Sequence, residues 1–122
     1  MLYSKRKRGI MTNSNCIFCK IANKEIPTEL IFETDDVVAF NDLSPQAPVH
    51  ILVIPKKHYE SLNEVDDVAL LGKLLSGVKE ITKKLNIKEY RTVINTGKEA
   101  GQAVFHIHLH ILAGRTMLWP PG

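Results

Sequence analysis

The sequence contains no long hydrophobic run and only two cysteines in 122 residues. No apolar stretch approaches the roughly 18 residues that a membrane helix needs, so we expect no membrane association. The first 14 residues lack the apolar segment of a secretory signal. Without an export signal, the two thiols are expected to bind a metal or to stay free in a reducing compartment. The sequence therefore predicts a cytoplasmic protein, with the nucleus as the alternative location.

The net charge of +3 is concentrated at the start of the chain. Four of the 16 basic residues form KRKR at residues 5–8, which leaves 12 to balance the 13 acidic residues. A nucleic-acid-binding domain would carry its basic residues over the folded surface instead. We predict a disordered basic tail over residues 1–14 and a single domain over residues 15–122, with nucleic acid an unlikely partner.

Hydrophobic periodicity predicts one long helix and several strands. Apolar residues recur at intervals of three and four between Val68 and Leu85, which is typical of an amphipathic helix. A shorter helix is expected after Asn15, where it would carry the sequence CIFC. The predicted strands cover residues 30–34, 37–42, 50–55, 90–96 and 105–114. Together these elements predict an α+β fold, an antiparallel sheet with a helix on one face.

Three of the five histidines alternate with apolar residues in FHIHLHIL, residues 105–112. A strand would place the three imidazoles on one face and Phe105, Ile107, Leu109 and Ile111 on the other. His106 and His110 would then lie about 13 Å apart between their Cα atoms. Zn²⁺ binds imidazole nitrogens at about 2.0 Å, so one ion does not explain all three histidines. The alternative is a half-exposed strand that happens to be rich in histidine.

The sequence HIHLHIL resembles the signature of the histidine triad superfamily. The resemblance to its nucleotide-binding Hint branch extends from Asn15 to Gly122, through CIFCKI, KEIPTELIFETDDVVAFNDLSPQAPVHILVIPKKH, VINTGKEAGQAVFHIHLHILAGR and WPPG. It implies a homodimer with a continuous antiparallel sheet and no organic cofactor. It also implies hydrolysis of the P–N bond of purine nucleoside 5′-phosphoramidates through a covalent nucleotidyl-histidine intermediate. The alternatives are a dinucleoside polyphosphate hydrolase and a nucleotide-binding scaffold with vestigial catalysis.

The resemblance assigns catalytic roles to three histidines. His108 is the predicted nucleophile, because a neutral imidazole can attack phosphorus and form a phosphoimidazole that water hydrolyses. His110, on the same face of the strand, is expected to hydrogen-bond a phosphate oxygen and stabilise developing charge. His50 is the third predicted member of the catalytic group.

The resemblance also implies the nucleotide contacts. Asp42 matches the residue that accepts hydrogen bonds from the ribose hydroxyls, and apolar side chains are expected around the base. Position 103 departs from the pattern, because Ala103 has no hydroxyl with which to assist the leaving group. The predicted base contacts are Phe18, Ile21, Phe40 and Leu43, and the predicted phosphate and sugar contacts are Asn95, Gly101, Gln102, Ala103 and Val104.

Cys16 and Cys19 form a CxxC pair that can present two sulfurs to one ion. The resemblance implies that His50 and His106 complete a structural zinc site. The alternative is two buried thiols, with His50 and His106 hydrogen-bonded to each other. His58, in PKKH, is expected in a solvated turn. Trp119, in WPPG, is expected to be buried against a partner subunit.

Overall fold

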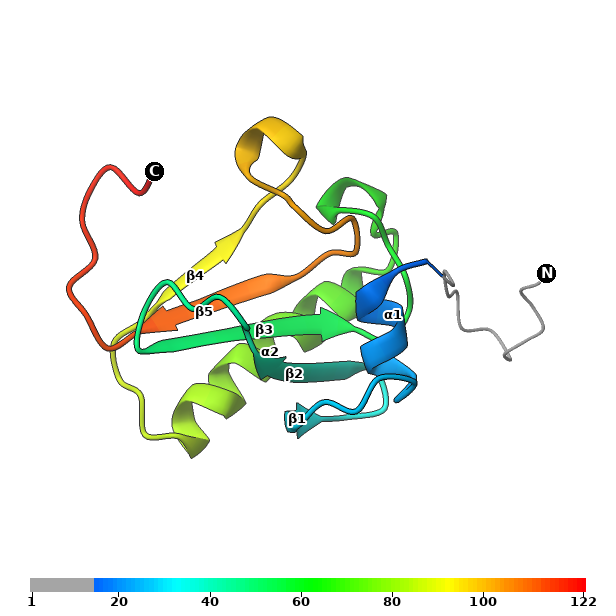
Figure 1. Cartoon of the computed structure of the whole chain (residues 1–122), viewed down its shortest axis with the longest axis horizontal. Helices are drawn as coiled ribbons and strands as arrows, with labels where there is room; N and C mark the ends of the chain where they lie inside the picture. The colour runs from blue at the N-terminus through cyan, green and yellow to red at the C-terminus, as the bar shows by residue number, and fades with distance from the viewer. Residues whose placement is uncertain (1–14) are drawn as a thin grey trace.

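The computed structural model describes residues 15–122, and the predicted basic tail at residues 1–14 lies outside the described residues. A single five-stranded antiparallel sheet has the strand order β1-β2-β3-β5-β4 (Figure 1). The predicted α+β class is confirmed. The helices are α1 (Ile17–Ala22) and α2 (Val68–Lys84), and the strands are β1 (Leu30–Glu33), β2 (Val37–Asn41), β3 (Val49–Pro55), β4 (Arg91–Ile94) and β5 (Leu109–Ala113).

The long helix forms where the periodicity predicts it. The side chain of Asp67 accepts a hydrogen bond from the backbone N–H of Leu70 and caps the start of α2. The apolar stripe is narrower than the sequence suggests, because Val68 and Leu75 are 81% and 51% exposed. Among the described residues, no helix has the length and apolar character needed to cross a membrane.

The two helices cover opposite faces of the sheet (Figure 1). Because side chains alternate along a strand, each central strand contributes to both cores. The core under α2 includes Val37, Ala39, Ile51, Val53, Leu109 and Ile111, and the core under α1 includes Val38, Phe40, Leu52 and Ile54. His110 lies between Leu109 and Ile111 in β5, so its side chain lies on the α1 face, where the candidate site is built.

The strand predicted over residues 105–114 is shorter in the structure. It begins only at Leu109, and Phe105, predicted to share a face with Ile107 and Leu109, is 48% exposed while those two residues are buried. The segment before β5 does not pair as a strand, because the backbone N–H of Ile107 donates to the carbonyl of Tyr59. Ile107, Leu109 and Ile111 nevertheless share the core under α2, so the predicted alternation with the histidines holds from residue 106 to residue 111.

Candidate active site and candidate metal centre

His50, His108 and His110 lie together on the α1 face of the sheet. In the pairing of β3 with β5, Leu52 lies opposite His110. His50 precedes Leu52 by two residues in β3, so its side chain lies on the same face of the sheet, diagonally across from His110. The Nε2 atom of His50 lies 2.9 Å from Nδ1 of His110, and the ring centroids of His108 and His110 are 4.9 Å apart. The structure therefore brings together the three predicted catalytic histidines.

The backbone determines which nitrogen of His50 carries the proton. The N–H of Gln46 donates to Nδ1 of His50 over 3.0 Å, so this nitrogen is unprotonated. In the neutral ring the proton then lies on Nε2, which donates to Nδ1 of His110. His110 must consequently carry its own proton on Nε2, and this buried atom has no hydrogen-bond partner among the described residues. A buried donor without a partner is suited to receive an anionic oxygen.

His108 is fixed in the opposite tautomer. Its Nδ1 donates to the backbone carbonyl of His106 over 2.8 Å, so in the neutral ring Nε2 holds a lone pair. Burial lowers the pKa of His108, and burial together with His108 and His50 lowers the pKa of His110 to about 4. Both rings are therefore neutral near pH 7. One presents a nucleophilic nitrogen and the other presents an N–H donor.

A largely apolar pocket of about 580 Å³ lies beside these histidines. The ring of Phe18 forms part of its wall and contacts the ring of His108 edge-on, with centroids 5.2 Å apart. Asp42 lines the same pocket, and its carboxylate lies 3.5 Å from Nε2 of His50. Ile21, Phe40, Leu43 and Val104, four further predicted contacts, also line the pocket. Among the described residues, no histidine lines this pocket directly, and its connection to His108 and His50 runs through Phe18 and Asp42. A larger hollow of about 890 Å³ lies between the start of β4 and the C-terminal segment, and none of its lining residues is a predicted site residue.

The remaining predicted nucleotide contacts lie in and around the glycine-bearing loop. Gly101 has a φ of +99°, and its carbonyl accepts a hydrogen bond from the side chain of Asn95. Gln102 is buried, and its amide bonds the backbone of Gly97, Glu60 and Val104. Its observed contacts hold the loop in place. Ala103 is exposed, and nucleotide contacts by these loop residues stay a prediction.

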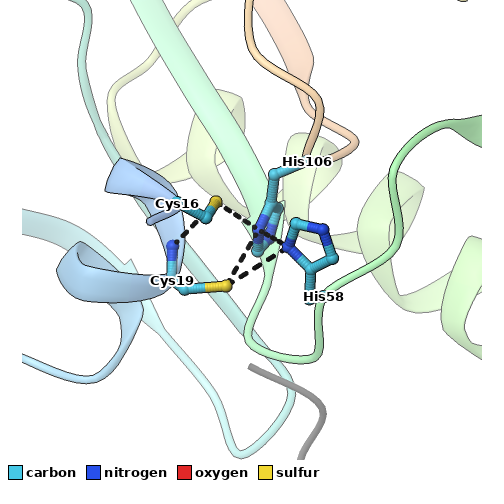
Figure 2. Close-up of side chains that lie close together, drawn as sticks. All are labelled: Cys16, Cys19, His58 and His106. Atoms are coloured by element: carbon cyan, nitrogen blue, oxygen red, sulfur yellow. Dashed lines mark hydrogen bonds between the residues drawn. The ribbon is translucent and has the colours of Figure 1, made fainter. Parts of the chain in front are cut away.

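A second cluster contains Cys16, Cys19, His58 and His106 (Figure 2). His58 replaces His50 in the predicted set. It lies in the turn after β3, as predicted, but it is half-buried against the cluster and not solvated. The cysteines lie at the Pro55 end of β3, where Nε2 of His106 donates to the Pro55 carbonyl. His50 lies at the other end of the strand, about 17 Å from Pro55 at the usual rise per residue. His50 and His106 therefore do not pair with each other, as the alternative without zinc required.

The geometry of this cluster fits a tetrahedral zinc site. Zn–N and Zn–S bonds of the usual lengths separate two nitrogens by about 3.4 Å, and a nitrogen and a sulfur by about 3.6 Å. Nδ1 of His106 lies 3.2 Å from Nδ1 of His58, 3.4 Å from Sγ of Cys16 and 3.5 Å from Sγ of Cys19. Because Nε2 of His106 donates to a carbonyl, its Nδ1 keeps a lone pair for a metal.

The protonation of the cluster also favours a metal. A hydrogen bond with Cys19, with smaller contributions from His106 and His58, lowers the pKa of Cys16 well below its ordinary value of 9.0. Thiolate is the form that binds zinc. Asp42, His50 and His110 also converge, but there the Gln46 N–H places the His50 proton on Nε2, the atom that would have to bind the ion. The structure therefore favours the cysteine cluster as the metal centre.

Acidification is expected to destabilise the folded protein through His110. This ring faces His108 and His50, which lower its pKa, and Asp42, which raises it. Between the ordinary pKa of 6.5 and the folded value of about 4, the unfolded chain binds more protons. The free energy of unfolding should therefore fall as the pH decreases, by up to about 1.4 kcal/mol per pH unit for one proton. Urea unfolding at several pH values measures this slope. His110→Gln should make the slope shallower by the contribution of one bound proton. An equal slope in the variant would contradict the assignment.

Comparison with known proteins identifies the family. The HIT domain family matches residues 23–117. An uncharacterised HIT-like protein of Synechococcus elongatus is 50% identical over 113 residues, covering 90% of this chain and 99% of that protein. Adenylylsulfatase HINT1 of Arabidopsis thaliana is 45% identical over 116 residues, covering 91% and 79%. The crystal structure of a HIT family hydrolase from Legionella pneumophila superposes with a TM-score of 0.85 at 48% identity, covering 88% of this chain and all of that one. The chain belongs to the HIT domain family.

Proposed function

We propose that the protein hydrolyses the P–N bond of purine nucleoside 5′-phosphoramidates, releasing a nucleoside monophosphate and an amine. The observation that supports this most strongly is the pair of neighbouring imidazoles in opposite tautomers, His108 with a lone pair on Nε2 and His110 with a proton on Nε2. They stand beside a pocket of nucleotide size whose wall includes a carboxylate, that of Asp42.

The proposed reaction takes place in two displacements at the α-phosphorus. Nε2 of His108 forms a bond to phosphorus while the P–N bond breaks, and the departing nitrogen takes up a proton from solvent, so that it leaves as a neutral amine. Water then attacks the phosphoimidazole, its proton passes to solvent, and His108 is restored. The Nε2–H of His110 donates to a non-bridging oxygen whose negative charge increases in both transition states.

The leaving group distinguishes a second candidate substrate. An amine must be protonated to leave, and Ala103 offers no hydroxyl for this step. Sulfate leaves as a stable anion without a proton, and one similar plant protein is named adenylylsulfatase. Adenylyl sulfate is therefore the second candidate.

The purified protein should be assayed with adenosine 5′-phosphoramidate, adenylyl sulfate and a dinucleoside polyphosphate. Exclusive cleavage of the dinucleoside polyphosphate would contradict the proposal.

Asp42 is expected to recognise the ribose. The backbone N–H of Ser44 donates to Oδ1 of Asp42 over 2.7 Å, which holds the carboxylate at the pocket wall. Replacing Asp42 with asparagine removes charge-assisted hydrogen bonds worth about 1.5–3 kcal/mol, so KM should rise about 10- to 100-fold. The control is a 2′,3′-dideoxy substrate, whose KM should be the same for both proteins. An equal rise of KM for this substrate would exclude the ribose role.

We also propose that the cluster of Cys16, Cys19, His58 and His106 binds one structural zinc ion. The two sulfur atoms, the unprotonated Nδ1 of His106 and the separations between the donor atoms support this assignment. Elemental analysis of protein purified without a histidine tag should find about one zinc per chain. Purified protein that is fully folded and contains no zinc would contradict the zinc site.

We further propose a homodimer that extends the sheet across β4. This strand lies at one edge of the sheet, and Ile94 within it is 36% exposed. Leu118 and Trp119 are 73% and 82% exposed in the single chain, which suits burial against a second copy. Light scattering after gel filtration should give the mass of two chains, and Ile94→Lys should shift it towards one. Val68→Lys, at an exposed position on α2 and away from the edge strand, is the control. Monomeric wild-type protein would exclude the dimer.

A further inference from the structure

The metal centre and the active site share a residue, His106. Its side chain contributes Nδ1 to the cysteine cluster, and its backbone carbonyl accepts the hydrogen bond that fixes the tautomer of His108. The ring is fully buried, and its Nε2 donates to the carbonyl of Pro55. His106 is therefore held from both ring nitrogens. Its position determines where the acceptor for the His108 proton lies.

Helix α1 provides a second connection between the two sites. Phe18 lies between Cys16 and Cys19 in the sequence, and its ring contacts the rings of His106 and His108 edge-on at 5.9 and 5.2 Å. The same ring lines the pocket. A helix of only six residues is too short to be stable by itself, so its position depends on what its side chains contact. The sulfur of Cys19 lies 3.3 Å from Nδ1 of His58, in the turn that follows β3 (Figure 2).

We propose that a metal bound by this cluster positions the nucleotide site, so that metal occupancy controls nucleotide affinity and the orientation of His108. The inference rests on the proposed function and on the proposed zinc site. When bound, the metal would tie α1, the turn at His58 and His106 into one unit. Without it, thiol and imidazole contacts alone must hold α1 against the sheet. Phe18 and the His106 carbonyl would then both be less well fixed.

The expected effect is large because both connections lead to His108. Residues that orient a group at a functional site typically contribute 10- to 100-fold when they are lost, and a displacement of about 1 Å can have a comparable effect on rate. When the Phe18 ring is held less firmly in the pocket wall, the dissociation constant of AMP should rise about tenfold. Loss of a fixed acceptor should allow both tautomers of His108 to be populated.

His58 is the most suitable residue for the test, because its contacts given above are to the cluster and not to the pocket. His58→Ala removes one ligand, whereas His58→Cys replaces it with another zinc ligand. Lys57→Ala changes the neighbouring residue of the same turn and serves as the control. For each protein we would measure zinc content, the circular dichroism spectrum, the dissociation constant of AMP by calorimetry, and the ¹⁵N chemical shifts of the His108 ring.

We expect His58→Ala to be folded and depleted in zinc, to bind AMP about tenfold more weakly and to show mixed His108 tautomers. His58→Cys should retain zinc and the wild-type values. The proposal is overturned if a folded, zinc-free variant keeps both the AMP affinity and the His108 shifts. If His58→Ala does not fold, Cys16→Ser is judged by the same two outcomes. Neither readout requires hydrolysis, so wild-type protein that binds AMP without cleaving a phosphoramidate would contradict the proposed function alone.

Discussion

Replacing His108 with alanine is expected to reduce the hydrolysis of adenosine 5′-phosphoramidate by at least about 10⁴-fold, because loss of a nucleophile removes the covalent route altogether. The ring of His108 is buried, and its Nδ1 donates to the His106 carbonyl, which leaves the lone pair of Nε2 for the attack. Among residues 15–122, no other histidine presents an equivalent lone pair beside the pocket. The measurement is kcat/KM under conditions where the wild-type protein turns over many times.

A matched variant distinguishes the nucleophile from its neighbour. His110→Gln keeps a side-chain N–H donor but changes its position, so its loss of kcat should be smaller, on the order of 10²-fold. Both variants should bind AMP, because the pocket wall and Asp42 are unchanged. Turnover by His108→Ala equal to that of the parent protein would remove the enzyme interpretation.

The second large effect is expected from loss of the proposed zinc site. Cys19 is almost fully buried, and its backbone N–H donates to the sulfur of Cys16 at the start of α1. Replacing Cys19 with alanine should abolish zinc binding and destabilise the domain by about 3 kcal/mol, which corresponds to a Tm lower by about 10–20 °C. The domain should still fold, because the core between α2 and the sheet does not involve the cluster.

A chelator provides the control for this prediction. It should lower the Tm of the wild-type protein to a similar extent, and it should leave the Tm of Cys19→Ala unchanged, because that variant has no metal to lose. A variant whose Tm equals that of the zinc-loaded parent would show that the cluster contributes nothing to stability.

Much of the fold could be predicted from the sequence because its patterns are local. The spacing of apolar residues predicts α2, and alternation predicts the face of β5 on which His110 lies. The exact start of β5 could not be predicted, because the segment from residue 105 to residue 108 has the same alternation as a strand. Its backbone instead bonds a loop and a side chain, and these are tertiary contacts.

The proposed metal ligands show the same limit of local sequence patterns. The CxxC pair is a local signal and correctly locates half of the cluster. Which histidines join it depends on which end of β3 lies under α1, and this is set by packing. His58 had a usable signal, because it follows closely after a buried strand that ends at Pro55. The tautomers of His50 and His108 had no such signal, since backbone groups of Gln46 and His106 determine them.

The most direct test of the mechanism is to detect the covalent intermediate. Protein mixed with adenosine 5′-phosphoramidate should be quenched with base within one turnover, digested and analysed by mass spectrometry, because a phosphoimidazole survives base better than acid. We predict one adenylyl group on the peptide that contains His108, attached through the imidazole of that residue. Full hydrolytic activity with no adenylylated peptide at any time, or with the group attached to another residue, would contradict the assignment of His108 as nucleophile.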